Sequence, residues 1–204
     1  MINIKSYTVP SVFLKTKFKD HSKYKKQVLD LIKKSGDNSW DNKDSYFNDK
    51  LVKTDWPKAN NWDRPWTKLI GQSLYDTLTK LSQHLGYKGI ILHKLWYQQY
   101  AYGDTHNWHI HAANYTGAYF LESNKKHSTT EFLYPNDLNN SFTLEIEEGD
   151  IVFFPCSVIH RSAASQSKKN KTIISWNLDF DLIQNQFLQD KNKIDVLKED
   201  TKNA

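Results

Sequence analysis

The pattern of apolar and polar positions divides this chain into a helical first half and a β-rich second half. Apolar residues recur at helical spacing in two segments, residues 21–34 and 65–84. Asp20 stands at the start of the first segment as a candidate N-cap, Pro65 opens the second, and a glycine follows each of them. Two helices are therefore predicted. Before them, the rough alternation in residues 2–18 predicts one or two short strands.

From Lys88 onward the pattern is that of a β protein. Short apolar or alternating runs are separated by Gly, Asn, Asp, Ser and Lys, and they predict strands at 89–101, 115–122, 129–134, 141–147, 150–155, 158–164 and 171–180. Many short strands suggest a sandwich or barrel, with the helices buttressing one sheet. The predicted fold class is therefore α+β, mainly β. We expect one domain over residues 1–204, with 1–87 as support, 88–180 as the core and 181–204 as a weakly helical tail.

The segment between the predicted helices is rich in Asn, Asp, Lys and Trp. Residues 37–63 are predicted to form a long surface loop with short ordered pieces, and loops of this length often act as lids or binding loops. Its tryptophans offer two readings. Either they make residues 40–66 a lid over a site, or they pin the loop to the core.

Composition and charge narrow the class of protein. The 204 residues carry a net charge of +5 spread over many lysines, which permits an acidic partner but makes nucleic-acid binding only a minor alternative. The lone Cys156 excludes an internal disulfide and suggests a buried, unreactive thiol. No signal-peptide pattern and no membrane-length apolar run are present. We expect a cytoplasmic protein, bacterial or virus-encoded, that is a monomer or a weak homodimer.

Three histidines in the β-rich half form a candidate metal site. His109 and His111 are spaced i and i+2, so on a strand their side chains point to the same face. About fifty residues later, His160 follows a hydrophobic strand that begins after Gly149. A small barrel can bring these imidazoles to one ion, and neutral imidazole is a ligand for Fe, Zn, Cu and Ni.

The strand at 171–178 adds polar residues to the same expected cavity. With a period of two, Lys171, Ile173, Ser175 and Asn177 share one face. A lysine in an apolar barrel needs an anionic partner, because an unpaired buried ammonium is costly. Candidates for shaping the cavity wall are Ser175, Asn177, Tyr119 and Trp176. By strand parity Arg161 points away from the cavity, and His106 is expected at the surface.

The order and spacing of these motifs resemble the 2-oxoglutarate- and Fe(II)-dependent oxygenases, most closely the prolyl-4-hydroxylase-like branch and short relatives with a His-x-His motif. The branch has the signature Tyr-x-x-Gly, five residues, then His-x-Asp, and here Tyr100-Ala-Tyr-Gly103 precedes His109-Ile-His111. The distal Gly, hydrophobic run, Phe-Pro, four residues and His are matched by residues 149–160. Lys171 lies where that family has the Arg or Lys that binds the 5-carboxylate of 2-oxoglutarate, and the resemblance covers about residues 88–180.

The resemblance implies a double-stranded β-helix, or jelly roll, that holds Fe(II) and uses 2-oxoglutarate and O2 to hydroxylate a substrate, releasing succinate and CO2. His109, His111 and His160 would hold the iron, while Tyr100, Lys171, Ser175 and Asn177 would contact 2-oxoglutarate. The sequence departs from the family at His111, where Asp or Glu is expected. Asp104 and His106 remain alternative ligands.

Two other functions stay open at this point. One is a cupin-like or three-histidine dioxygenase that does not use 2-oxoglutarate, and the other is a metal-free jelly-roll binding protein. The sequence does not name the substrate, which could be a small molecule or a peptide.

Overall fold

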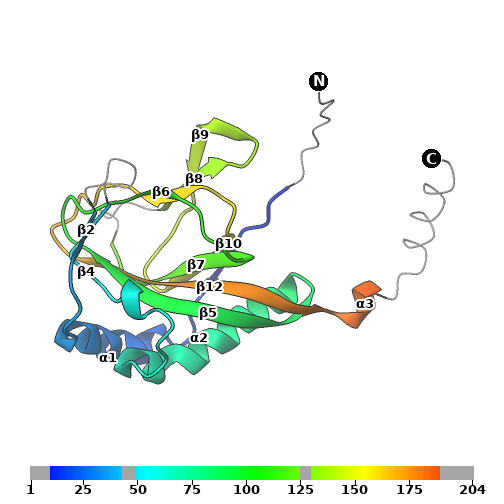
Figure 1. The fold of residues 1–204 in the computed structure, drawn as a ribbon, viewed down its shortest axis with the longest axis horizontal. Coiled ribbons are helices and arrows are strands. Elements are labelled where there is room, and N and C mark those ends of the chain that lie inside the picture. The colour runs from blue at the N-terminus through cyan, green and yellow to red at the C-terminus, as the bar shows by residue number, and fades with distance from the viewer. Residues whose placement is uncertain (1–9, 43–48, 125–129, 189–204) are drawn as a thin grey trace.

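The computed structural model describes residues 10–42, 49–124 and 130–188, and its core is a pair of facing β-sheets (Figure 1). The helices are α1 (His21–Lys34), the 3-10 helix η1 (Trp56–Lys58), α2 (Pro65–His84) and α3 (Asn185–Leu188). The strands before the core are β1 (Leu14–Lys17), β2 (Trp40–Asn42), β3 (Asp49–Leu51) and β4 (Lys53–Thr54). The core strands are β5 (Tyr87–Tyr100), β6 (His106–His109), β7 (Tyr115–Glu122), β8 (Thr130–Tyr134), β9 (Asp137–Thr143), β10 (Asp150–Pro155), β11 (His160–Ser162) and β12 (Lys171–Ile183).

The larger sheet has six strands in the order β1-β10-β7-β12-β5-β4, all antiparallel. Helices α1 and α2 cover its outer face (Figure 1). The apolar residues that sequence periodicity assigned to the helices, among them Val28, Ile32, Ile70 and Leu74, are fully buried there against the sheet. The prediction that helices buttress one sheet is thus confirmed.

The smaller sheet has four strands in the order β6-β11-β8-β9 and faces the other side of the large sheet. A second apolar cluster, including Phe120, Phe132, Val152 and Phe154, lies on this side of the large sheet. Side chains of the large sheet therefore alternate between a helix-side core and the space between the sheets. The predicted mainly β sandwich of jelly-roll type is what the structure shows.

Close packing within the large sheet requires a glycine at position 117. A Cβ there would lie 2.0 Å from the backbone oxygen of Val152 and 2.5 Å from the Trp176 ring. Both distances are shorter than van der Waals contact, and one of the two obstacles is backbone that cannot rotate away. Gly117 therefore lets β10 and the Trp176 indole approach the same point of β7.

Part of the segment predicted as a long loop is ordered and tied to the core. β2 pairs with β3, and β4 adds to the edge of β5. The Asp55 carboxylate accepts hydrogen bonds from the Arg64 guanidinium, from Trp66 Nε1 at 2.8 Å and from the backbone N–H of Tyr97 at 2.8 Å. The interpretation that tryptophans pin this segment is confirmed for Trp66, while residues 43–48 lie outside the described residues.

Several predicted boundaries need correction. The strand predicted at 141–147 is β9, which begins four residues earlier and ends at Thr143. Asp20 precedes α1, but its carboxylate makes no capping hydrogen bond and instead accepts one from the Ser73 hydroxyl of α2. Helix–helix contact thus replaces the cap. In the region predicted to hold one or two strands at 2–18, the described part contains β1, and most of the tail predicted at 183–204 lies outside the described residues.

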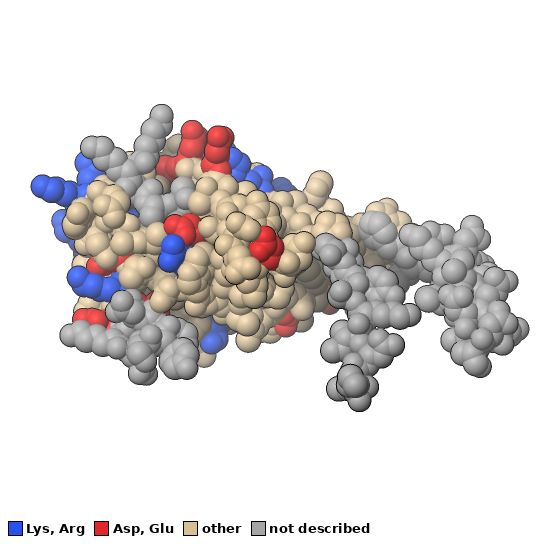
Figure 2. Space-filling view, turned by 90° about the horizontal axis from the view of Figure 1, so that it is seen from above, with Lys and Arg blue, Asp and Glu red and all other residues tan. Residues whose placement is uncertain are grey.

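The surface carries both signs of charge. Figure 2 shows basic and acidic side chains interspersed on the face it presents, without a single broad basic field. None of the helices among the described residues combines the length and the apolar character needed to cross a bilayer.

Candidate metal centre

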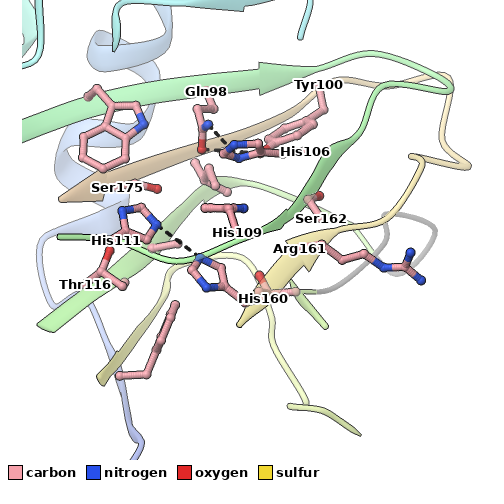
Figure 3. Close-up of a pocket in the computed structure, with 16 residues that line it drawn as sticks. Gln98, Tyr100, His106, His109, His111, Thr116, His160, Arg161, Ser162 and Ser175 are labelled. Carbon is pink, nitrogen blue, oxygen red and sulfur yellow. Dashed lines mark hydrogen bonds between the residues drawn. The ribbon is translucent and has the colours of Figure 1, made fainter. Parts of the chain in front are cut away.

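Three histidines converge between the two sheets. One ligating atom from each of His109, His111 and His160 lies within 4.8 Å of the others. The Nε2 atoms of His111 and His160 are 3.3 Å apart (Figure 3). Two neighbouring nitrogens bound to one metal at about 2.1 Å lie roughly 3 Å apart, so this separation fits a shared ion.

Hydrogen bonds at Nδ1 fix the tautomer of each imidazole. Nδ1–H of His109 donates to the Asn107 carbonyl at 2.6 Å, that of His160 to the Val158 carbonyl at 2.9 Å, and that of His111 to Asn177 Oδ1 at 2.8 Å. The proton therefore sits on Nδ1 in all three rings, and the Nε2 lone pairs are free for a metal. Such outer partners orient ligands in metalloproteins.

Burial keeps these imidazoles neutral. Desolvation, with a smaller contribution from the nearby His109, lowers the pKa of His111 to about 3. Desolvation also lowers the pKa of His109, and it depresses that of His160 well below the ordinary histidine value. Because metal ligation needs the neutral ring, the site is ready to bind a cation at neutral pH without releasing histidine protons.

Two short strands bring the histidines together. In the antiparallel pair β6–β11, His160 lies directly opposite His109. His109 and His111 were predicted to lie on one strand, but β6 ends at His109. His111 lies just beyond it, where its backbone N–H donates to the Cys156 carbonyl at 3.1 Å. The three histidines are thus brought together by β6, by the residues that follow it and by β11.

The histidines form part of the wall of a small cavity between the sheets, which we call the inner cavity (Figure 3). Its wall combines apolar and polar side chains, namely Trp96, Phe154, Ile173, Gln98, Tyr100, His106, Thr116, Ser162 and Ser175. Tyr100 and Ser175 are where the sequence placed them, at the cavity.

Lys171 lies behind this wall, with only 1% of its surface exposed. Its ammonium donates to Ser162 Oγ at 2.5 Å and lies 4.4 Å from the centre of the Tyr100 ring. Burial lowers the pKa of Lys171 to about 7. The expected buried lysine is therefore present, one hydrogen bond away from a residue that lines the inner cavity.

Two residues of β7 and β12 lie on the face of the large sheet opposite to the one we expected. Tyr119 and Trp176 were candidates for the cavity wall, but both are fully buried in the helix-side core. Parity explains this, because Trp176 neighbours Ser175 and must point to the opposite face of the sheet. Asn177 reaches the site through its hydrogen bond to His111 and is not part of the cavity wall.

His106 lies elsewhere than the sequence predicted, and Gln98 was not predicted at the site. His106 was expected at the surface, yet its ring stacks on His109 at 3.9 Å between centroids, and it lines the inner cavity. Gln98 Nε2 lies 3.1 Å from His106 Nδ1. Gln98 shares strand parity with Trp96 and Tyr100, so the alternation of β5 carried a signal for it.

Two other residues are excluded from the metal site. The Asp104 carboxylate, a candidate alternative ligand, is buried in its own turn and accepts the N–H of Ala101 at 2.9 Å. Arg161 borders the inner cavity, but its side chain points away from the histidines, as parity predicted (Figure 3). Its guanidinium lies 4.4 Å from the centre of the Trp108 ring. Cys156 is buried as expected, and burial raises the pKa of its thiol to about 12.

A second hollow adjoins the inner cavity and shares His106, His109 and His111 with it. This outer cleft has a volume of about 400 Å³. Its remaining wall comes from β5, from Ile110 and from the tryptophan-rich segment, namely Trp96, Gln98, Ile110, Trp40, Asp49, Leu51, Thr54 and Trp56. The described residues of this segment thus border the site, and its role as a lid stays a prediction.

Comparison with known proteins gives matches among solved structures only. No family model matches the chain, and no curated protein matches it. An oxidoreductase of the 2OG-Fe(II) oxygenase family from Burkholderia pseudomallei superposes with a TM-score of 0.60 at 10% identity, over 78% of this chain and 80% of that one.

Two further structures widen the comparison. The epimerase SnoN, solved with Fe3+, alpha ketoglutarate and nogalamycin RO, gives a TM-score of 0.63 at 11% identity, over 81% of this chain and 78% of that one. A prolyl hydroxylase solved with a hypoxia inducible factor peptide, from Trichoplax adhaerens, gives 0.55 at 17% identity, over 80% and 82%. At such low identities the likeness establishes the fold: this chain has the double-stranded β-helix of the 2-oxoglutarate–Fe(II) oxygenases.

Proposed function

We propose that this protein is an Fe(II)- and 2-oxoglutarate-dependent oxygenase that hydroxylates its substrate with release of succinate and CO2. The observation that carries the proposal is the joint presence of three imidazoles with free Nε2 atoms and a buried lysine beside one cavity. The fold, shared with oxygenases of this class, supports it.

The donor set fits ferrous iron. His109, His111 and His160 would hold the ion through Nε2, and three protein ligands leave the remaining positions of an octahedral ion open. With three neutral ligands the ion keeps its full charge of +2. The carboxylate of 2-oxoglutarate beside its keto group would offset one of these charges, so the loaded centre would carry one more positive charge than a centre with a carboxylate ligand at position 111.

The far end of the cavity suits the distal carboxylate of 2-oxoglutarate. Lys171 would pair with it, helped by the hydroxyls of Ser162 and Tyr100. A nearby carboxylate favours the ammonium, so binding would raise the Lys171 pKa from about 7. Ser175 would contact the cosubstrate along the wall, and Asn177 would act indirectly by holding His111.

The chemistry that such a centre supplies when loaded is oxidation of a substrate C–H bond by O2, coupled to decarboxylation of 2-oxoglutarate. The protein's own contribution is positioning and exclusion of water. Trp96, Phe154 and Ile173 give the inner cavity apolar walls, while the outer cleft is open to a substrate that reaches His109 and His111. A small molecule or a peptide side chain would fit this arrangement.

Succinate release tests the proposal. Purified protein given Fe(II), ascorbate, O2 and 2-oxoglutarate should form succinate, and formation should increase with a true substrate. The His160→Ala variant should form none above the level of free iron. Wild-type protein that retains iron but never releases succinate would contradict the use of 2-oxoglutarate.

One observation favours a second candidate. An all-histidine ligand set, with His111 in place of a carboxylate, also suits a three-histidine dioxygenase without 2-oxoglutarate. That enzyme would consume O2 with its substrate in the absence of 2-oxoglutarate. In such an enzyme Lys171 would have no role in binding a cosubstrate.

A further inference from the structure

The outer cleft contains a buried carboxylate that faces no cation. Asp49 of β3 is 7% exposed, and its Oδ1 accepts the backbone N–H of Asn107 at 2.7 Å. The basic group nearest to its other oxygen is His106, with Nε2 at 3.6 Å. Among residues 10–42, 49–124 and 130–188, no lysine or arginine lies within ion-pair distance of Asp49.

The neighbouring imidazole does not hydrogen-bond to this oxygen. At 3.6 Å, His106 Nε2 lies beyond the usual hydrogen-bond distance from Oδ2 of Asp49. Burial raises the pKa of Asp49, which reflects the cost of a carboxylate without a counter-charge. A cation placed beside Asp49 would remove this cost. The second oxygen of Asp49 therefore has unused capacity for an ionic hydrogen bond.

The rest of the cleft suits the body of a cationic ligand. Three indole rings line it, those of Trp40, Trp56 and Trp96, and the Trp56 and Trp96 rings meet edge to face at 4.6 Å. Indole faces attract ammonium groups and pack well against methylene chains. One such contact is already present, because the Lys94 ammonium lies 4.5 Å from the centre of the Trp56 ring.

We propose that the outer cleft binds a protonated amine on an aliphatic chain, with the ammonium paired to Asp49 and the chain packed against the tryptophans. This rests on the proposed function, because it assigns the substrate of that same site. Asp49 is the one acidic side chain that lines the cleft among the described residues. His109 and His111 line it as well, so a chain anchored at Asp49 lies beside the proposed metal centre.

Binding measurements on the full chain, without added iron or 2-oxoglutarate, test this independently of turnover. Calorimetry would compare three probes: n-pentylammonium, Nα-acetyl-lysine methylamide and its neutral Nε-acetylated analogue. We expect both cations to bind, and the neutral analogue to bind about 10- to 100-fold more weakly, as for loss of an ionic hydrogen bond. Tighter binding of pentylammonium would indicate a small amine, and tighter binding of the blocked lysine a protein side chain.

Two variants identify the groups responsible. Asp49→Asn keeps an acceptor for the Asn107 N–H and should weaken both cations by about 10- to 100-fold while leaving the neutral analogue unchanged. Asp63→Asn is the matched control, because it removes one carboxylate from a site that is 85% exposed, and it should change nothing. Trp40→Leu alters a ring at the rim and should weaken the cations by about threefold, even if Asp49→Asn fails to fold.

The proposal is overturned if neither amine binds, if the neutral analogue binds as tightly as the lysine probe, or if Asp49→Asn and Asp63→Asn behave alike. Failure of the oxygenase proposal would look different. In that case the amines would still bind in an Asp49-dependent way, but no succinate would form from 2-oxoglutarate with any of them.

Discussion

The two faces of β12 show how one strand serves both stability and chemistry. Ile174 and Trp176 are fully buried against the helices. Ser175 and Asn177, their neighbours on the opposite face, are almost as buried, at 6% and 7% exposure. Burial alone does not separate the faces. What separates them is chemistry: Ile174 and Trp176 are apolar, whereas the cavity-side face carries Ser175 and Asn177, and the strand begins with Lys171 on that same face.

The largest expected effect is on stability, and it comes from a substitution on the helix-side face of β12. Trp176→Ala should lower the free energy of unfolding by about 3–5 kcal/mol, because a large indole is removed from a packed core. Ser175→Ala, one residue away on the cavity face, should cost less than about 1 kcal/mol. Urea denaturation measures both. Equal losses would contradict the division of roles between the faces.

Lys171→Met should have the opposite effect: it should reduce ligand affinity and leave stability intact. The affinity for 2-oxoglutarate of protein loaded with Mn(II), a redox-stable substitute for iron, should fall at least about 30-fold, as for loss of one partner of a buried charge pair. The stability of the ligand-free protein should stay level or rise, since a buried ammonium is costly. Calorimetry and urea denaturation give the two quantities. Lys168→Met, at an exposed neighbouring lysine, is the control, and an equal affinity loss there would refute the role of Lys171.

Asn177→Ala should weaken metal binding by about 10- to 100-fold, the usual effect of removing an outer partner from a ligating histidine. The reason is that His111 would lose the acceptor of its Nδ1 proton. Asn177→Asp keeps an acceptor and should retain the affinity. Competition with a chromophoric chelator measures both variants. If alanine and aspartate weaken binding alike, the side chain acts through packing.

The smallest expected effect is the change in 2-oxoglutarate affinity with pH. The ammonium of Lys171 is the binding form, and its pKa in the free protein is about 7. A bound carboxylate raises that pKa, so binding takes up a proton above pH 7. The affinity should be level below pH 7 and fall by up to about tenfold per pH unit above it. Lys171→Met should abolish this slope in a calorimetric pH series, and a slope that persists belongs to another group.

Much of the fold followed from periodicity. Helices α1 and α2 have the bounds that their apolar spacing and flanking residues predicted, and β7 and β10 match their predicted strands. Parity also placed Lys171, Ser175 and Asn177 on one face. The same rule, applied to Trp176, would have excluded it from the cavity wall.

The remaining features depend on contacts between distant segments, which local patterns do not encode. His106 looked like a surface residue because its stacking on His109 and its contact with Gln98 arise only once β5 and β6 approach each other. The outer cleft likewise depends on the bridge between Lys50 and Thr105, which brings Asp49 to the histidines. No spacing rule connects those positions.

Anaerobic titration with Co(II), whose visible absorption reports the ligand set, tests the central claim most directly. We predict one bound ion per chain in the wild type, and loss of that spectrum in each of His109→Ala, His111→Ala and His160→Ala, with the fold retained by circular dichroism. A wild-type chain that binds no ion, or three variants that bind it as tightly as the wild type, would contradict a shared metal centre.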